Sequence, residues 1–255
     1  MTKFLVIASG KGGVGKTTTS INLAAALREC GKDVIIVDGD LINPNVSLYL
    51  GSDEVEHTLH DVLRGEISIS EAIYTHPSGI KVIPSSISLS DLPHAHYKAL
   101  GRALSPLEGY TDLVIVDSHP GINKDAQHIF KLADELLVVT VPELSAVTDA
   151  MKTIRMAESL GTNVMGVLIN RKERKGYEME SKEIESFLEK PVIGEIAEDK
   201  NVKKAAIENF PVYNLYPKSA ASRDFRKLAA SMAGIEEEKE DGFFRDVLKI
   251  FRISK

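Results

Sequence analysis

Short runs of β-branched and other apolar residues recur along the chain, separated by longer mixed segments. The apolar runs lie at 4–9, 33–40, 80–86, 112–118, 135–141, 163–170 and 191–196. Several are nearly continuous in Val, Ile and Leu, which is typical of strands covered on both faces. The segments between them indicate helices at 17–30, 58–65, 91–105, 145–161, 181–189, 200–209 and 219–234. This alternation predicts a single α/β domain, with a mostly parallel sheet between two helical layers.

The composition changes abruptly after Gly234. A charge run at 235–241 predicts a solvated tether between the body at 1–234 and a last segment at 242–255. On a helix this segment gathers apolar side chains on one face and mostly basic ones on the other, and it is too short to span a bilayer. We expect it to lie on an anionic membrane surface, with packing on the protein's own core as the alternative. The expected membrane residues are Phe243, Phe244, Val247, Leu248, Lys249, Ile250 and Phe251.

Composition narrows the classes of function. The 255 residues include 43% hydrophobic and 27% charged residues, as in an ordinary soluble globular protein. A formal net charge of -6 argues against coating nucleic acid over the whole surface, although a local basic patch would be hidden in that total. One cysteine, Cys30, excludes an internal disulfide and any two-cysteine metal motif within one chain. Without a signal peptide or a spanning segment, we expect a cytoplasmic protein.

A glycine-rich loop lies between the first predicted strand and the first predicted helix. Residues 10–17, GKGGVGKT, satisfy G-x-x-x-x-G-K-[ST] in the strand-loop-helix context that this phosphate-binding motif requires. Glycine permits positive φ and close backbone approach, so N–H groups and the helix start can surround phosphate oxygens. Lys16 would reach the β and γ phosphates, and the Thr17 hydroxyl would bind Mg²⁺. The predicted phosphate-binding residues are Gly10, Lys11, Gly12, Gly13, Val14, Gly15, Lys16, Thr17 and Thr18.

Carboxylates close two of the predicted strands. Asp38 and Asp40 end the run at 33–40, and Asp117 ends the run at 112–118. The carboxyl ends of parallel strands face the crevice where open α/β sheets bind ligands. We therefore expect these carboxylates to hold Mg²⁺ through its waters and to orient an attacking water.

The string KGGVGKTT at 11–18 resembles the deviant Walker A loop of the MinD/ParA family of ATPases, and the resemblance covers about residues 3–234. It implies ATP as the nucleotide and a homodimer in the ATP state. In such a dimer Lys11, the family's signature lysine, crosses the interface to the phosphates bound by the partner subunit. Such a lysine makes the dimer depend on the nucleotide and stabilises charge that develops in the transition state.

The resemblance also implies roles for the strand-end residues. Asp40 would position the hydrolytic water, which makes it catalytic together with Lys11 and Lys16. Asp38 and Asp117 would support the metal with Thr17. The NPN sequence at 43–45 matches a first switch, with Asn45 near the γ-phosphate.

After Asp117 the chain departs from the family pattern. The usual continuation is Asp-x-Pro-Ala-Gly, whereas residues 117–121 read DSHPG. We interpret His119 as a loop residue tolerated at the edge of a second switch, and proton handling is the alternative. The departure leaves the rate and regulation of hydrolysis open.

An amide side chain at the end of a later predicted strand indicates which nucleotide base is bound. Asn170, followed by Arg171, can both donate to and accept from an adenine edge, whereas guanine readers generally use a carboxylate. The resemblance makes Asn170 the adenine contact. A second base-side segment, usually Ile-Pro-Glu-Asp, reads IAED at 196–199, and the segment beginning at Pro142 and Glu143 is expected near the dimer face.

These features are similar to those of MinD proteins. They imply an ATPase that dimerises on ATP, binds the inner face of the cell membrane through its tail and leaves after hydrolysis, with an unidentified protein activator or cargo. A ParA-like DNA-partition ATPase is the alternative, which predicts a basic surface and leaves the tail unexplained. A metallocentre-assembly ATPase would need cysteines at a shared interface, for which Cys30 alone serves poorly.

Overall fold

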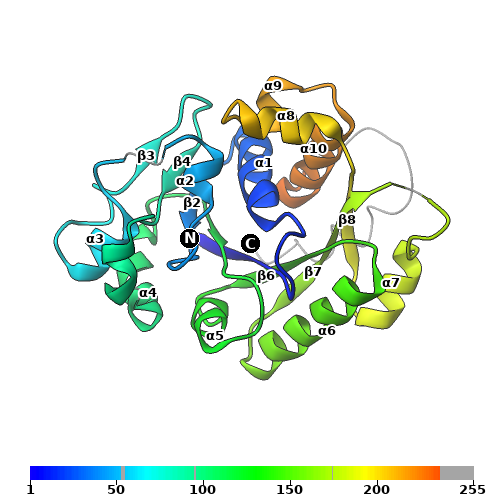
Figure 1. Ribbon diagram of the computed structural model, residues 1–255, viewed down its shortest axis with the longest axis horizontal. Helices are drawn as coiled ribbons and strands as arrows, with labels where there is room; N and C mark the ends of the chain where they lie inside the picture. Colours follow the sequence, from blue (N-terminus) through cyan, green and yellow to red (C-terminus); the bar gives the residue numbers. More distant parts are fainter. Residues whose placement is uncertain (53–54, 95, 174, 236–255) are drawn as a thin grey trace.

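One eight-stranded sheet organises the molecule (Figure 1). The computed structural model describes residues 1–52, 55–94, 96–173 and 175–235. The strands are β1 (Lys3–Ala8), β2 (Val34–Asp38), β3 (Tyr74–Thr75), β4 (Lys81–Ile83), β5 (Leu113–Asp117), β6 (Glu135–Thr140), β7 (Val164–Lys172) and β8 (Val192–Ala197). Their order is β3-β4-β2-β5-β1-β6-β7-β8, and every neighbouring pair is parallel except β3 with β4. The predicted mostly parallel sheet is therefore confirmed.

Helices cover both faces of the sheet (Figure 1). One face is covered by α1 (Lys16–Glu29), α2 (Val46–Tyr49), α8 (Lys200–Ile207), α9 (Val212–Leu215) and α10 (Ala220–Ala233). The other is covered by α3 (Leu59–Arg64), α4 (Leu100–Leu104), α5 (Lys124–Phe130), α6 (Leu144–Ser159) and α7 (Ser181–Leu188). The predicted three-layer architecture is confirmed.

The alternation of side chains along the strands explains the continuous apolar runs. In β1, Phe4 and Val6 belong to the core under α5 and α6, whereas Leu5 and Ile7 belong to the core under α1 and α10. Successive side chains of a strand point to opposite faces, so a strand between two helical layers needs apolar residues at every position.

The predicted helix over 91–105 is wrong as a continuous element. It is broken into 3₁₀ turns at Leu89–His94, Tyr97–Ala99 and Ser105–Leu107, with α4 between the last two. Pro93 lacks the backbone N–H that the interior of an α-helix requires, and proline disfavours helical backbone in the residue before it. Tertiary packing of Leu100 and Leu104 preserves only one short α-helix here.

The helix α10 ends where the composition changes. Gly234 caps it with a φ angle of 72°, in the left-handed region that favours glycine. The proposed tether and amphipathic segment at 236–255 lie outside the described residues, so both stay predictions. Within the described part of the chain, no helix has the length and apolar composition to cross a membrane.

Candidate functional site

The carboxyl ends of β2, β5 and β1 meet at one edge of the sheet. Asp38 closes β2 and Asp117 closes β5, and these two residues are partners in the strand register. Asp117 also pairs with Ile7 of β1, just before the glycine loop that we define as residues 10–15. Parallel pairing thus brings residues that are far apart in the sequence to one crevice.

The glycine loop borders an open cavity. Gly13 and Gly15 have φ angles of 81° and 98°, which are left-handed conformations that favour glycine. A Cβ added at Gly12 or Gly13 would meet nothing within 4 Å. The cavity has a volume of about 550 Å³ and is lined by this loop, the start of α1, the loops after β2 and β5, and Arg171. A glycine loop that leads into a helix N-terminus is suited to holding phosphate.

The first turn of α1 faces the acid that closes β5. The Thr17 hydroxyl donates a hydrogen bond to Asp117 Oδ2 at 2.6 Å, and the Ser20 hydroxyl donates to Asp117 Oδ1 at 3.1 Å. Burial raises the pKa of Asp117, an effect that neighbouring Lys16 opposes. Burial lowers the pKa of Lys16, while the carboxylates around it, Asp117 foremost, act in the opposite direction. The site is therefore a desolvated group of opposite charges, which a bound polyphosphate and a divalent cation would complete.

The loop after β2 is folded around its own carboxylates. Asp38 Oδ2 accepts hydrogen bonds from the backbone N–H groups of Asn45 (3.0 Å) and Val46 (2.9 Å), at the start of α2. Burial, reinforced by Asp117, raises the pKa of Asp38 well above its usual range. Asp40 Oδ1 accepts from the backbone N–H of Asn43 at 2.9 Å. Asp38 thus shapes the loop, and its predicted support of a metal stays a prediction.

The predicted base contact lies under the glycine loop. Asn170 is only 5% exposed, and its Nδ2 donates to the Val14 carbonyl at 2.8 Å. A Cβ at Gly15 would come within 2.1 Å of the same nitrogen. Arg171 has a φ angle of 55° and is exposed at the edge of the cavity. The structure thus brings both residues to the site, while their contact with adenine stays a prediction.

The other predicted binding residues lie around the same loop. Lys11 and Asn45 are exposed, and Thr18 lines the cavity. Val14 is buried under the loop. A Cβ at Gly10 would collide with the backbone of Asp149 in α6, so that glycine is needed for close packing. The predicted segment after β6 begins α6, with Glu143 at its N-cap.

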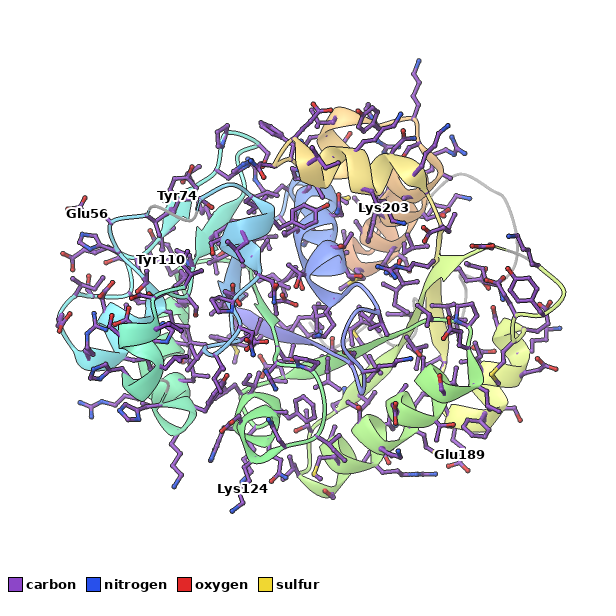
Figure 2. The ribbon with its side chains drawn as sticks, viewed as in Figure 1. Glu56, Tyr74, Tyr110, Lys124, Glu189 and Lys203 are labelled. Carbon is purple, nitrogen blue, oxygen red and sulfur yellow. The ribbon has the colours of Figure 1, made fainter. Side chains whose placement is uncertain are left out.

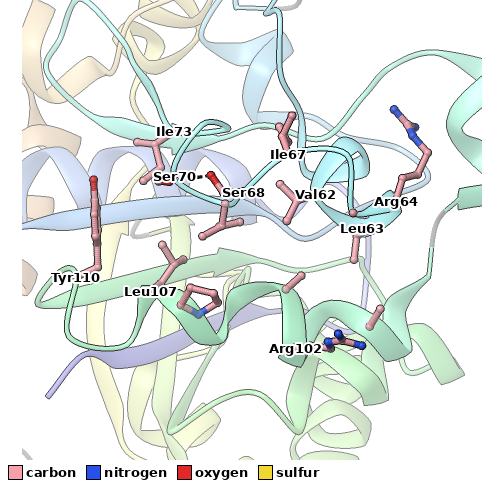
Figure 3. Close-up of a pocket in the computed structure, with 15 residues that line it drawn as sticks. Val62, Leu63, Arg64, Ile67, Ser68, Ser70, Ile73, Arg102, Leu107 and Tyr110 are labelled. Atoms are coloured by element: carbon pink, nitrogen blue, oxygen red, sulfur yellow. Dashed lines mark hydrogen bonds between the residues drawn. The ribbon is translucent and has the colours of Figure 1, made fainter.

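A second hollow lies between α3 and α4 and has a different chemistry (Figure 3). Its volume is about 620 Å³, and aliphatic side chains such as Ile67, Ile73 and Leu107 line most of it. Tyr110 stands at one end, in the part of the molecule where Figure 2 also places Tyr74. None of the predicted site residues lines this hollow. It is therefore not the candidate phosphate site.

The fold and the glycine-loop geometry define a P-loop nucleotide-binding protein. Residues 5–212 match the family described as the CobQ/CobB/MinD/ParA nucleotide binding domain. The chain therefore belongs to this family.

Similar proteins and a similar solved structure agree with this assignment. An uncharacterized ATP-binding protein of Methanocaldococcus jannaschii is 38% identical over 250 residues, covering 96% of this chain and 95% of that protein. The septum site-determining protein MinD of Thermotoga maritima is 32% identical over 259 residues, covering 95% and 92%. The structure of MinD from Pyrococcus horikoshii OT3 complexed with Mg-ADP aligns with a TM-score of 0.85 at 33% identity, covering 90% of this chain and 95% of that one.

The residues present fit a magnesium nucleotide. Gly12 and Gly13 leave room for phosphate oxygens against the backbone. The Thr17 hydroxyl, which is hydrogen-bonded to the Asp117 carboxylate, is a hard oxygen of the kind that Mg²⁺ prefers beside phosphate oxygens and waters. Thr17 would be a direct ligand and Asp117 a partner to it.

Two side-chain contacts at the site were not predicted from the sequence. Ser20 lies three residues after Thr17, so helical spacing already placed it on the same face of the first helix. His119 was interpreted as a tolerated loop residue, yet its Nδ1 lies 3.1 Å from Asp40 Oδ1. Only the packing of two loops reveals that contact.

Proposed function

We propose that this protein is a magnesium-dependent ATPase that dimerises on ATP and cycles on and off a membrane as a spatial-positioning switch. The observation that carries the proposal is the arrangement of Lys16, Thr17 and Asp117 beneath an open glycine loop. The similarity to septum site-determining MinD proteins supports the choice of ATP and of positioning as the biological role.

Hydrolysis of ATP gives ADP and phosphate, as the γ-phosphorus gains a bond to water oxygen and loses its bond to the β–γ bridging oxygen. One proton of the water stays on the phosphate and the other is released to solvent. Thr17, with Asp117 behind it, would hold Mg²⁺, which would supply charge neutralisation at the β and γ phosphates. Lys16 donates to the same phosphates, and Lys11 of the partner subunit adds a second cation. Asp40 accepts a hydrogen bond from the attacking water and aims it at phosphorus. Asn170 and Arg171 hold the adenine side.

Exposed apolar side chains support dimerisation over the site. Ile42, Leu48, Ile122 and Leu144 are 42%, 50%, 39% and 62% exposed. They follow the carboxyl ends of β2, β5 and β6, so they surround the same edge of the sheet as the cavity. Apolar groups gathered at such an edge mark an interaction surface. A second copy seated there would bring Lys11 within reach of the opposite site.

Membrane attachment is proposed from the sequence of 242–255. A single amphipathic helix binds a membrane weakly, whereas a dimer presents two, so avidity would couple the ATP state to residence on the membrane. The membrane would be the anionic inner face of the cell membrane, and a protein activator or cargo would meet the ATP dimer there.

Co-sedimentation with liposomes tests the switch. The intact chain and a chain ending at Gly234 are compared with anionic and with neutral liposomes, in Mg-ATP and in Mg-ADP. We expect sedimentation only for the intact chain with ATP and anionic lipid. If nucleotide and tail make no difference, the membrane switch is wrong. Salt-sensitive binding of duplex DNA by the ATP form would then favour the partition alternative.

A further inference from the structure

The loops after β2 and β5 are joined by a contact between His119 and Asp40. The Nδ1 atom of His119 lies 3.1 Å from Asp40 Oδ1, and the two side chains are 19% and 6% exposed. A carboxylate only accepts hydrogen bonds, so Nδ1 carries the proton and donates it. Both residues line the cavity over the glycine loop.

The histidine stands on a loop that is fixed to the base of the site. The Ser118 backbone N–H donates to the Ile7 carbonyl at 3.2 Å, and the Gly121 N–H donates to the Ser9 carbonyl at 2.8 Å. These bonds tie both sides of His119 to β1 and to the residue that precedes the glycine loop. The imidazole is therefore held in a fixed position relative to the same backbone that would hold the phosphates.

The hydrogen bonds to Asp40 fix which oxygen is occupied. Oδ1 accepts from the Asn43 backbone N–H at 2.9 Å and from His119 at 3.1 Å. Among the described residues, both hydrogen bonds to this carboxylate fall on Oδ1. One donor comes from its own loop and one from the loop after β5, so they oppose rotation of the carboxylate about χ2. Oδ2 is then the oxygen that is left to accept a hydrogen bond from a water in the cavity.

We propose that His119 is a positioning residue that holds Asp40 in the orientation required to aim the attacking water. This inference rests on the proposed ATPase function and adds a residue at a position where the family pattern has none of this chemistry. The histidine touches neither nucleotide nor water in this scheme and acts only through Asp40. Misplacement of a reacting group by about 1 Å can cost about 100-fold in rate. We therefore expect loss of His119 to lower kcat by about ten- to a hundredfold.

The variants separate a positioning role from a structural one. His119→Leu keeps bulk and removes the donor, whereas His119→Asn restores an amide donor at about the position of Nδ1. His128→Leu is the matched control, because His128 is a similarly part-buried histidine on the following helix, α5. Each change is also made in the Asp40→Ala background. For every protein, kcat, KM for ATP and the thermal midpoint are measured with Mg²⁺.

We expect His119→Leu to lower kcat with KM changed by less than about threefold, His119→Asn to recover most of the loss, and His128→Leu to resemble the parent. In the Asp40→Ala background His119→Leu should have no further effect, because residues that act as a unit are not additive. The inference would be overturned if His119→Leu left kcat unchanged. It would also be overturned if His119→Leu lowered kcat by the same factor in the Asp40→Ala background as in the parent. If the parent chain does not hydrolyse ATP at all, the proposed function itself has failed.

Discussion

At the level of single residues, Gly15 is constrained from two directions. Its φ angle of 98° is one that L side chains rarely adopt. Its missing side chain also makes room for Asn170, whose Nδ2 bonds the neighbouring Val14 carbonyl. The glycine is therefore required by the protein's own packing before any phosphate is considered.

Replacing this glycine should destabilise the nucleotide-free protein. Gly15→Ala forces a strained backbone and a collision with Asn170, and we expect the free energy of unfolding to fall by about 1–3 kcal/mol. Urea unfolding without nucleotide measures the change. Gly12→Ala is the control, since a Cβ there meets nothing, and it should stay within about 0.5 kcal/mol. Equal losses in the two variants would contradict the argument.

Site residues that belong to a continuous motif or that end an apolar strand could be predicted from the sequence. The glycine loop with Lys16 and Thr17 is one continuous string, and Asp117 ends an apolar strand, so their meeting followed from parallel topology. The contact of His119 with Asp40 depends on how two loops fold against each other, which no periodicity encodes. Asn170 was predicted at the site, but its hydrogen bond to the Val14 carbonyl under the loop depends on tertiary packing in the same way.

At the level of elements, long segments were predicted, whereas several of the short ones were not. The helices α6 and α10 were foreseen because each carries several turns of apolar periodicity, and α1 because a run rich in alanine and leucine follows the glycine loop. The elements β3, α2, α5 and α9 were missed, since two to seven residues give too few repeats to establish a period. Even so, Asn123 could have signalled the start of α5, because its side chain caps the helix by accepting from the Ala126 N–H at 2.9 Å.

Asp199 joins two elements, and removing it should loosen both. Its Oδ1 accepts from the Asn201 N–H at the start of α8 (2.9 Å), and its Oδ2 accepts from the Ala221 N–H in α10 (3.2 Å). We expect Asp199→Ala to lower the free energy of unfolding by about 1–3 kcal/mol, through the lost cap and an unpaired donor.

Denaturant unfolding measures that loss, with Glu198→Ala as the neighbouring control. Glu198 is exposed, and its side-chain ion pairs with the described residues are long, at 4.0 and 3.9 Å, so its removal should change stability by less than about 0.5 kcal/mol. A stability of Asp199→Ala equal to that of the control would mean that solvent replaces both hydrogen bonds without loss.

At the level of the whole molecule, function depends on which surface meets a partner. The apolar rim of the cavity, which we define as Ile42, Leu48, Ile122 and Leu144, lies at the carboxyl edge of the sheet. Charged side chains such as Lys124 and Glu189 also lie on the periphery of the molecule (Figure 2). The proposed dimer would use the apolar side chains at this edge.

A charge placed on that rim should block association. Leu144→Asp introduces a carboxylate at the first position of α6, where an acid is compatible with the helix N-terminus. In an Asp40→Ala parent, which should hydrolyse ATP more slowly and so hold the ATP state longer, we expect light scattering to report a dimer with Mg-ATP and a monomer for the Leu144→Asp variant. Ile207→Asp, at an 82% exposed position on α8, should dimerise like its parent. A dimeric Leu144→Asp protein would remove this edge from the interface.

The place of β1 in the sheet also has a consequence for synthesis on the ribosome. The strand is made first, yet it pairs only with β5 and β6, which end at Asp117 and Thr140. The glycine loop therefore leaves the ribosome long before the neighbours that fix its base exist, and Asn170 arrives later still. A nascent chain of this protein therefore carries an apolar strand without its first sheet partner until Asp117 has been made, and the base of the site is completed only after Asn170.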